Sequence, residues 1–247
     1  MGLPTRRLLI IATCAIGILL HATSGAAQDQ VRVGVDVGLQ TATPKFVATA
    51  LFTEFVEEGM VTANHTVGSN VVFSGGATVR AWRGLAIGAA VSFFSKAGTS
   101  ELEVELPHPF LFNQPRLVSG AASDLKRREI ATHVMFGWIM PADQMEIILS
   151  AGPSIFHVQQ DLVSGITYTH AYPYDVAEFT GATIRRLTKV AVGFHVSGDV
   201  TWKLTPDIGL AASGRYSHAT TTDDETGSSF DVGGVQVGGG IRFFFGF

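Results

Sequence analysis

Residues 31–40 of this chain alternate between an apolar face and a face of polar residues and glycine. Valines and Leu39 take the odd positions, whereas Arg32, Asp36 and Gln40 lie at even positions. Because successive side chains of a β-strand point to opposite faces, this period of two indicates a strand between two unlike surroundings. The pattern recurs in seven further segments, least clearly in the fourth of them: 71–80, 85–96, 129–138, 145–158, 190–203, 208–220 and 231–247.

The lengths of these segments and of their connections indicate strands that cross a membrane. A tilted strand needs ~9–11 residues to span a bilayer. Most connections are either short or long: 82–84, 141–144 and 204–207 are short, 41–69, 97–127 and 159–186 are long, and 221–230 is intermediate. Short turns at one end and long loops at the other are typical of transmembrane barrels, in which an even number of strands closes the sheet.

We therefore predict an all-β fold, a closed antiparallel eight-stranded up-and-down transmembrane β-barrel with both chain ends on the periplasmic side. An exported β-sandwich is the alternative, but its loops would be short at both ends. The glycines, serines and single charges of the polar face suit the narrow lumen of eight strands. Ten strands are expected instead if residues 46–55 pair as an additional hairpin.

The N-terminus has the three parts of a secretory signal peptide. Arg6 and Arg7 are basic, residues 8–20 are apolar, and the stretch 22–27 contains small residues. The apolar run is too short to cross a bilayer as a helix, so we expect a signal peptide that is cleaved after Ala27. The expected division is a signal peptide at 1–27 and a barrel domain at 28–247.

Charge and cysteine content exclude several classes of function. Loss of Arg6 and Arg7 changes the formal charge from −4 to −6, and an acidic chain without a basic patch is not expected to bind nucleic acid. The single cysteine, Cys14, lies within the apolar run, so we expect neither disulfides nor cysteine metal sites in 28–247. No second apolar stretch reaches the length of a membrane-spanning helix.

The last strand ends on a row of apolar and aromatic residues that share one face: Ile241, Phe243, Phe245 and Phe247. Such a row on a soluble protein would invite aggregation, whereas at a membrane boundary it would join an aromatic girdle. This ending resembles the C-terminal signal of bacterial outer-membrane proteins. Together with the signal peptide and the eight strands, the chain resembles small outer-membrane β-barrel proteins of the OmpA, OmpX and OmpW kind.

The resemblance implies a place in the bacterial outer membrane. It also implies that the barrel-assembly machinery reads the last strand, and that the other partners are outer-membrane lipid and lipopolysaccharide. No cofactor is expected. Aromatic residues in the long segments around Phe46, Phe110 and Tyr172 could bind a surface ligand, or could pack on one another to order the mouth of the barrel.

The polar faces of the predicted strands place charged residues and histidines in the lumen. They are Arg32, Asp36, Arg80, Lys96, Glu129, His133, His195, Asp199, Lys203, Arg215 and Arg242. Charges enclosed in a barrel must be paired, so we expect a plug of ion pairs, with a narrow pore or a conduit for hydrophobic solutes as the alternative. The histidines lack the spacing of a metal site, so no metal is expected.

Two further patterns have weaker chemical meaning. Glu101, Glu103 and Glu105 alternate with apolar residues, which predicts that the third strand continues past the membrane and pairs its carboxylates with residues 126–128 of the next strand. His218 and Thr220 share an outward face and faintly resemble the seventh-strand motif of lipid A deacylases. The motif departs from that family at Thr220 itself, so we do not expect an enzyme.

Overall fold

The computed structural model describes residues 30–41 and 43–246, and the predicted signal peptide lies outside them. The described part is built from ten strands: β1 (Gln30–Gln40), β2 (Thr43–Glu54), β3 (Glu57–Val67), β4 (Asn70–Trp82), β5 (Leu85–Leu106), β6 (Arg116–Ala142), β7 (Met145–His170), β8 (Ala177–Lys203), β9 (Ile208–Thr222) and β10 (Ser229–Gly246). In this part of the chain, no helix is long and apolar enough to cross a membrane.

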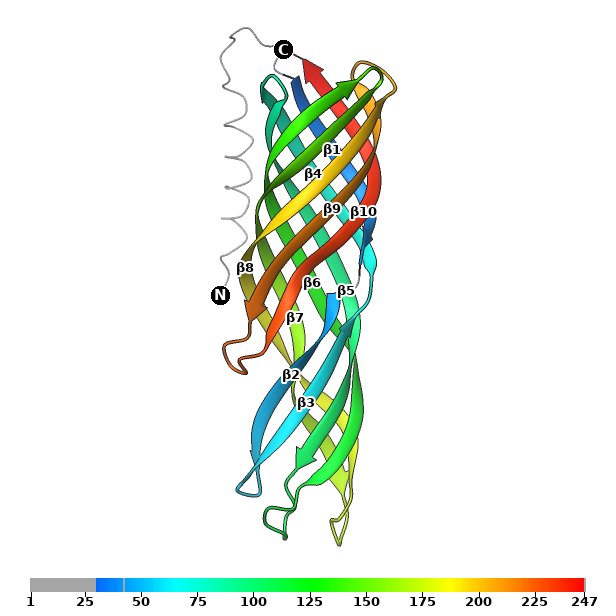
Figure 1. The fold of residues 1–247 in the computed structure, drawn as a ribbon. Coiled ribbons are helices and arrows are strands. Elements are labelled where there is room, and N and C mark those ends of the chain that lie inside the picture. Colours follow the sequence, from blue (N-terminus) through cyan, green and yellow to red (C-terminus); the bar gives the residue numbers. More distant parts are fainter. Residues whose placement is uncertain (1–29, 42, 247) are drawn as a thin grey trace, which may run out of the picture.

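Eight of the strands form a hydrogen-bonded ring. The antiparallel sheet has the order β2-β3-β5-β4-β1-β10-β9-β8-β7-β6, and an additional pairing of β5 with β6 joins the sheet to itself. The first and last strands pair along their length, from Gln30 opposite Gly246 to Gln40 opposite Gln236. The short turns lie at the same end of the ring as the C-terminal end of β10 (Figure 1).

The outer wall of the ring is apolar, as the alternation predicts. Val35, Val37 and Leu39 of β1 are each more than half exposed, whereas Arg32, on the inward face of the same strand, is buried. The final strand behaves alike: Ile241, Phe243 and Phe245 are exposed, and Phe244 and Arg242 are buried; Phe247 lies outside the described residues. An apolar outer face of this extent needs lipid around it.

Most of the residues predicted as long loops lie in strands, so that prediction is wrong for all but the connections at 107–115 and 171–176 and the short turns. β6 and β8 have 27 residues each, well beyond the length that crosses a bilayer, and they continue past the ring at the end far from the short turns (Figure 1). The alternative of an additional hairpin is confirmed, because residues 46–55 lie in the hairpin of β2 and β3. We call this part of the molecule, which lies beyond the ring, the extension.

The extension has two layers. On one side β3 pairs with the outer part of β5, from Met60 opposite Glu105 to Thr66 opposite Thr99, which builds a sheet of β2, β3, β5 and β6. On the other side β7 and β8 continue as a hairpin, and β6 and β7 no longer pair beyond Arg127 and Gln160.

An apolar cluster fills the space between the two layers. Its buried members are Val61, Ala63, Leu102, Val104, Leu106, Val118, Ala122, Leu125 and Val163. Each strand buries one face here and exposes the other to water, as residues 101–106 of β5 show, so its polar residues face solvent where the ring strands face lipid.

Candidate functional site

The lumen of the ring is filled in layers, beginning with an ion-pair network near the short turns. Arg32 on β1 donates to Asp199 and, at 2.9 Å, to the Thr201 hydroxyl, both on β8. The same guanidinium lies 3.4 Å from Glu146 Oε1 on β7. Arg32 therefore ties three strands together across the lumen.

Arg242 on β10 is the second centre of this network. It donates to Asp36 Oδ1 at 2.7 Å and to Asp199, so that Asp199 lies between two guanidinium groups. Two further cations, Arg80 and Lys203, approach Glu146 Oε2 at 3.7 and 3.4 Å from the rim of the ring. Each carboxylate of the network thus has at least one cation beside it.

A histidine layer follows this network along the lumen, on the side toward the extension. His133 Nδ1 and His195 Nδ1 lie 2.8 and 3.0 Å from the same Ser154 hydroxyl, and Ser92 lies 3.2 Å from His133 Nε2. Both rings are fully buried, with their centroids 4.8 Å apart. Serine hydroxyl groups thus pair with both ring nitrogens of His133 and with Nδ1 of His195.

A third set of polar side chains lies beyond the histidines, closer to the extension. Glu129 accepts from Arg127 Nε at 2.5 Å and from the backbone of Gly233 at 3.1 Å. Gln40 bridges the seam of the first and last strands, because Gln236 donates to its Oε1 at 2.8 Å. The Arg127 guanidinium also lies over the ring of Phe230, 5.6 Å from its centroid.

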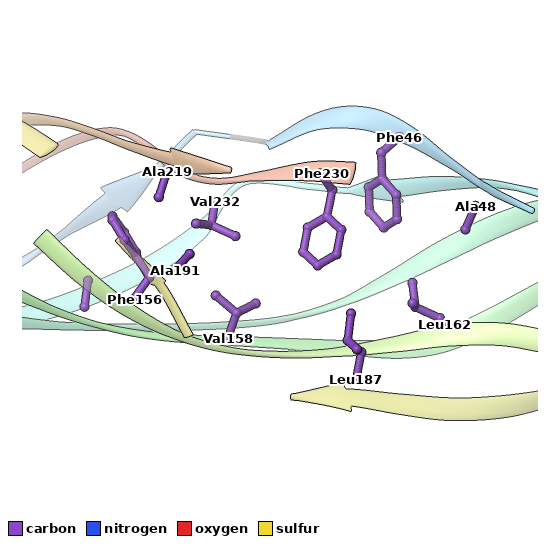
Figure 2. Close-up of a cluster of buried hydrophobic side chains, with 11 residues drawn as sticks. Phe46, Ala48, Phe156, Val158, Leu162, Leu187, Ala191, Ala219, Phe230 and Val232 are labelled. Atoms are coloured by element: carbon purple, nitrogen blue, oxygen red, sulfur yellow. The ribbon is translucent and has the colours of Figure 1, made fainter. Parts of the chain in front are cut away.

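An apolar cluster closes the lumen beyond these polar layers. Figure 2 shows Phe46, Phe156 and Phe230 projecting into the same interior space from different strands. Phe46 stacks on Phe230 at 5.1 Å and on His65 at 4.7 Å. The remaining buried members are Ala48, Ala131, Val158, Leu162, Leu187, Ala191, Ala219 and Val232.

Nine of the eleven lumenal residues that the sequence predicts take part in these layers, and Arg215 and Lys96 do not. Arg215 Nη1 lies 3.5 Å from Gln236 Oε1. Lys96 has no ion-pair partner among residues 30–41 and 43–246, and it is half-buried. The sequence prediction missed Glu146, Gln40 and Gln236. Glu146 lies in segment 145–158, where isoleucine occurs on both faces and hides the alternation.

The outer wall carries an aromatic belt at the end with the short turns. The three tryptophans of the chain, Trp82, Trp138 and Trp202, lie close to these turns and are each more than half exposed. Phe243 and Phe245 of the last strand lie at the same end. Tryptophans at this level are typical of the interface between lipid tails and water.

The tips of the extension are ordered by aromatic contacts. His170 lies between Phe55, Tyr168 and Tyr174, with centroid distances of 6.3, 5.3 and 4.8 Å. Arg116 donates to the carbonyl oxygen of Tyr174 at 3.0 Å. The aromatic residues here pack on one another, and several of them are also mainly exposed: Phe110, Phe112 and Tyr172.

Ion pairs hold the outer ends of the strands. Hydrogen bonds from Arg186 hold the pKa of Asp161 below its ordinary value, and Asp161 also accepts from the backbone of Lys126. Burial raises the pKa of Asp223, but hydrogen bonds from Arg185 and Thr226 outweigh it, so the pKa is lowered overall. These carboxylates are therefore charged near neutral pH.

The predicted pairing of the glutamate row is wrong. Glu101 lies opposite Ala121 and Glu105 opposite Leu117, because the register of β5 and β6 places Lys126 opposite Ala97 instead. Arg127 turns inward to Glu129. The related prediction, that this strand continues beyond the membrane, is confirmed by the extent of β5.

The residues with a faint deacylase pattern lie on the outer face of β9. Thr220 donates to Asp231 Oδ1 at 2.9 Å, and the His218 ring lies near Phe194 and Tyr216 at 6.1 and 6.5 Å. In the described part of the chain no hydrogen bond joins His218 to Thr220. Among the same residues, no group of three or more His, Cys, Asp or Glu could hold a metal ion.

Comparison with known proteins identifies the fold. No protein-family model and no curated protein sequence matches the chain. The outer-membrane protein OprG from Pseudomonas aeruginosa matches in structure with a TM-score of 0.50 at 7% identity, over 90% of this chain and 98% of that chain. The match to OprG shows that this chain has the fold of a small outer-membrane β-barrel.

Two other outer-membrane structures match with lower scores. The protease OmpT from Escherichia coli has a TM-score of 0.47 at 10% identity, over 91% of this chain and 99% of that chain. Neisserial surface protein A has a TM-score of 0.39 at 13% identity, over 90% of this chain and all of that chain.

Proposed function

We propose that this chain resides in the bacterial outer membrane as a non-conducting eight-stranded barrel, and that its extension contacts lipopolysaccharide or a surface partner. The observation that carries the proposal is that successive layers of side chains block the lumen. The ion-pair network around Arg242, the histidine layer and the apolar cluster around Phe156 follow one another along the ring. An eight-stranded wall encloses little more volume than its own side chains fill.

The extension supports the second half of the proposal. A loop that only connects two strands has no need of its own core, yet the extension buries an apolar cluster between two layers. That core holds the tips in place, where Phe110, Phe112 and Tyr172 are exposed. Exposed aromatic side chains on a rigid support are typical of binding surfaces, because little conformational entropy is lost on contact.

Recording in planar lipid bilayers tests the sealed lumen. The folded full-length protein should insert without ohmic current steps. The doubly substituted variant F156A/F230A is the matched comparison, since it removes two rings from the apolar cluster and leaves the outer wall unchanged. Steady ohmic steps from the unsubstituted protein would contradict the proposal and favour a pore.

The proposal includes no enzymatic activity. Mass spectrometry of lipid A from cells that express the protein checks this part, and we expect an unchanged acyl pattern. Loss of an acyl chain that depends on His218 would show that the outer face of β9 acts on lipid.

A further inference from the structure

A cavity of about 100 Å³ lies inside the ring, between the ion-pair network and the histidine layer. Its polar lining includes Arg215, Gln236, Asp36, Asp199 and Arg242. Much of the remaining lining is glycine or serine, so no large side chain fills the space: Gly34, Gly38, Gly76, Gly238, Ser150 and Ser197. The volume is enough for one small ion together with a few water molecules.

Arg215 is the cation of this cavity that lacks a carboxylate. Its Nη1 lies 3.5 Å from the side-chain oxygen of Gln236, at the limit of a hydrogen bond, and its buried Nε has no partner. Among residues 30–41 and 43–246, no carboxylate oxygen lies within 4.0 Å of this guanidinium. The carboxylates nearby are already engaged, because Asp36 accepts from Arg242 and Ser213.

The charges of the lumen below the histidine layer are not balanced. Five cations (Arg32, Arg80, Lys203, Arg215 and Arg242) share three carboxylates (Asp36, Glu146 and Asp199). Arg80 and Lys203 lie at the rim with side chains 29% and 28% exposed, and both approach Glu146, so this carboxylate and ions of the solvent balance them. Farther inside, the three cations Arg32, Arg215 and Arg242 share two carboxylates, Asp36 and Asp199. Arg215 lies deeper in the lumen, and its positive charge needs an internal counterion because an unpaired buried charge costs several kcal/mol.

We propose that the cavity binds one small monovalent anion of the size of chloride, held by the Arg215 guanidinium. The hydroxyl groups of Ser150 and Ser197, which lie 2.7 Å apart, also line the cavity, and one of their O–H groups is free to donate to the anion. The Gln236 amide turns its oxygen toward Arg215 and therefore orients the guanidinium instead of binding the anion. The anion stabilises the ring in place of a further carboxylate. Gluconate is the comparison anion, because it is much larger than chloride and carries several hydroxyl groups.

Thermal unfolding of the full-length protein in detergent micelles tests the site. At constant ionic strength and pH, the midpoint should be higher in sodium chloride or bromide than in sodium gluconate. A concentration ten times the dissociation constant should raise it by about 4 °C. Arg215→Gln should abolish this dependence, whereas Arg83→Gln, which removes an exposed cation from the turn after β4, should retain it.

Bromide anomalous diffraction of the unsubstituted protein gives a second measurement that needs no variant. A bromide peak beside Arg215 in the lumen would support the proposal. Equal unfolding midpoints in bromide and gluconate, together with no peak in the cavity, would overturn it. A halide dependence that persists in Arg215→Gln would also overturn it, because the ion would then bind elsewhere. Both measurements are independent of whether the lumen conducts or the extension binds a partner.

Discussion

Arg242 Nη2 on the last strand lies 2.7 Å from Asp36 Oδ1 on the first strand, directly inside the seam where the two ends of the described chain pair. The two residues are separated by 206 positions in the sequence. Arg242 also donates to Asp199 of β8, so one guanidinium links three strands of the ring. Such a link stabilises the closed ring relative to an open one, because each partner alone would be an unpaired buried charge.

Arg242→Gln should therefore destabilise the ring strongly. The substitution deprives Asp36 of its arginine and leaves Asp199 with Arg32 alone, and breaking a buried pair by removing one partner costs about 3–5 kcal/mol. The free energy of unfolding in urea, followed by tryptophan fluorescence in micelles, measures the loss. Adding Asp36→Asn should recover part of it, and full additivity of the two substitutions would show that the pair is not coupled.

A charged residue on the outward face of the ring should lower the free energy of unfolding, and the loss should be greatest near the middle of the membrane. Val196 on β8 is more than half exposed and lies near the middle of the part of the strand that pairs within the ring. Val196→Arg should cost about 2–4 kcal/mol in lipid vesicles. Val176→Arg is the matched control, because Val176 is 71% exposed near the tip of the extension. Equal small costs at both positions would argue against a lipid boundary around the ring.

Phe156→Ala should leave a void in the apolar cluster that closes the lumen. Phe156 is 1% exposed and packs edge-on against His133 at 6.1 Å. Loss of a buried phenylalanine ring costs about 3–5 kcal/mol, because the surrounding strands relax only partly into the void. Urea unfolding in micelles gives the value. Phe156→Leu should lose much less unfolding free energy than Phe156→Ala. An equal loss in both variants would point to disturbed folding instead of a void.

The ring could be predicted from the sequence because a lipid-facing strand must be apolar at every second position. In β1 the valines face outward and Arg32 and Asp36 face inward, as the alternation requires. The lumenal partners could be predicted only as a set. Which carboxylate meets Arg32 depends on the register of β7 and β8, and residue type alone does not determine that register.

The extension was harder to predict because the outward face of its long strands meets lipid in the ring and water beyond it. β5 begins as a lipid-facing strand and ends as one side of a water-exposed sheet, so Val91 and Glu103 point outward from the same strand. The register of β5 and β6 also shifts between Gly98 and Ser100. The extra residue lies on β6, where the buried positions change from even numbers, as at Ala122, to odd numbers, as at Leu125, so the alternation is broken in that strand.

The extension should be less stable in mild acid because of His65. Its ring is 1% exposed and stacks on Phe46, and burial lowers the pKa of His65 from 6.5 to about 4. Between these two pH values the unfolded extension binds a proton that the folded one does not, so stability rises with pH in this window. The contribution is complete above pH 6.5 and is lost as the pH falls toward 4, by roughly 3 kcal/mol at most.

Hydrogen exchange of β3 and limited proteolysis of the extension at pH 7 and pH 4.5 measure this effect. His65→Phe retains an aromatic ring beside Phe46 and has no group that titrates, so its extension should lose less protection in acid than that of the unsubstituted protein. The ring of eight strands is the internal control, because the substitution lies outside it. An equal acid loss in both proteins would show that His65 is not the source of the sensitivity. Asp161 and Asp223 do not account for a loss at pH 4.5, because their pKa values are lowered and their contribution to stability is lost only at lower pH.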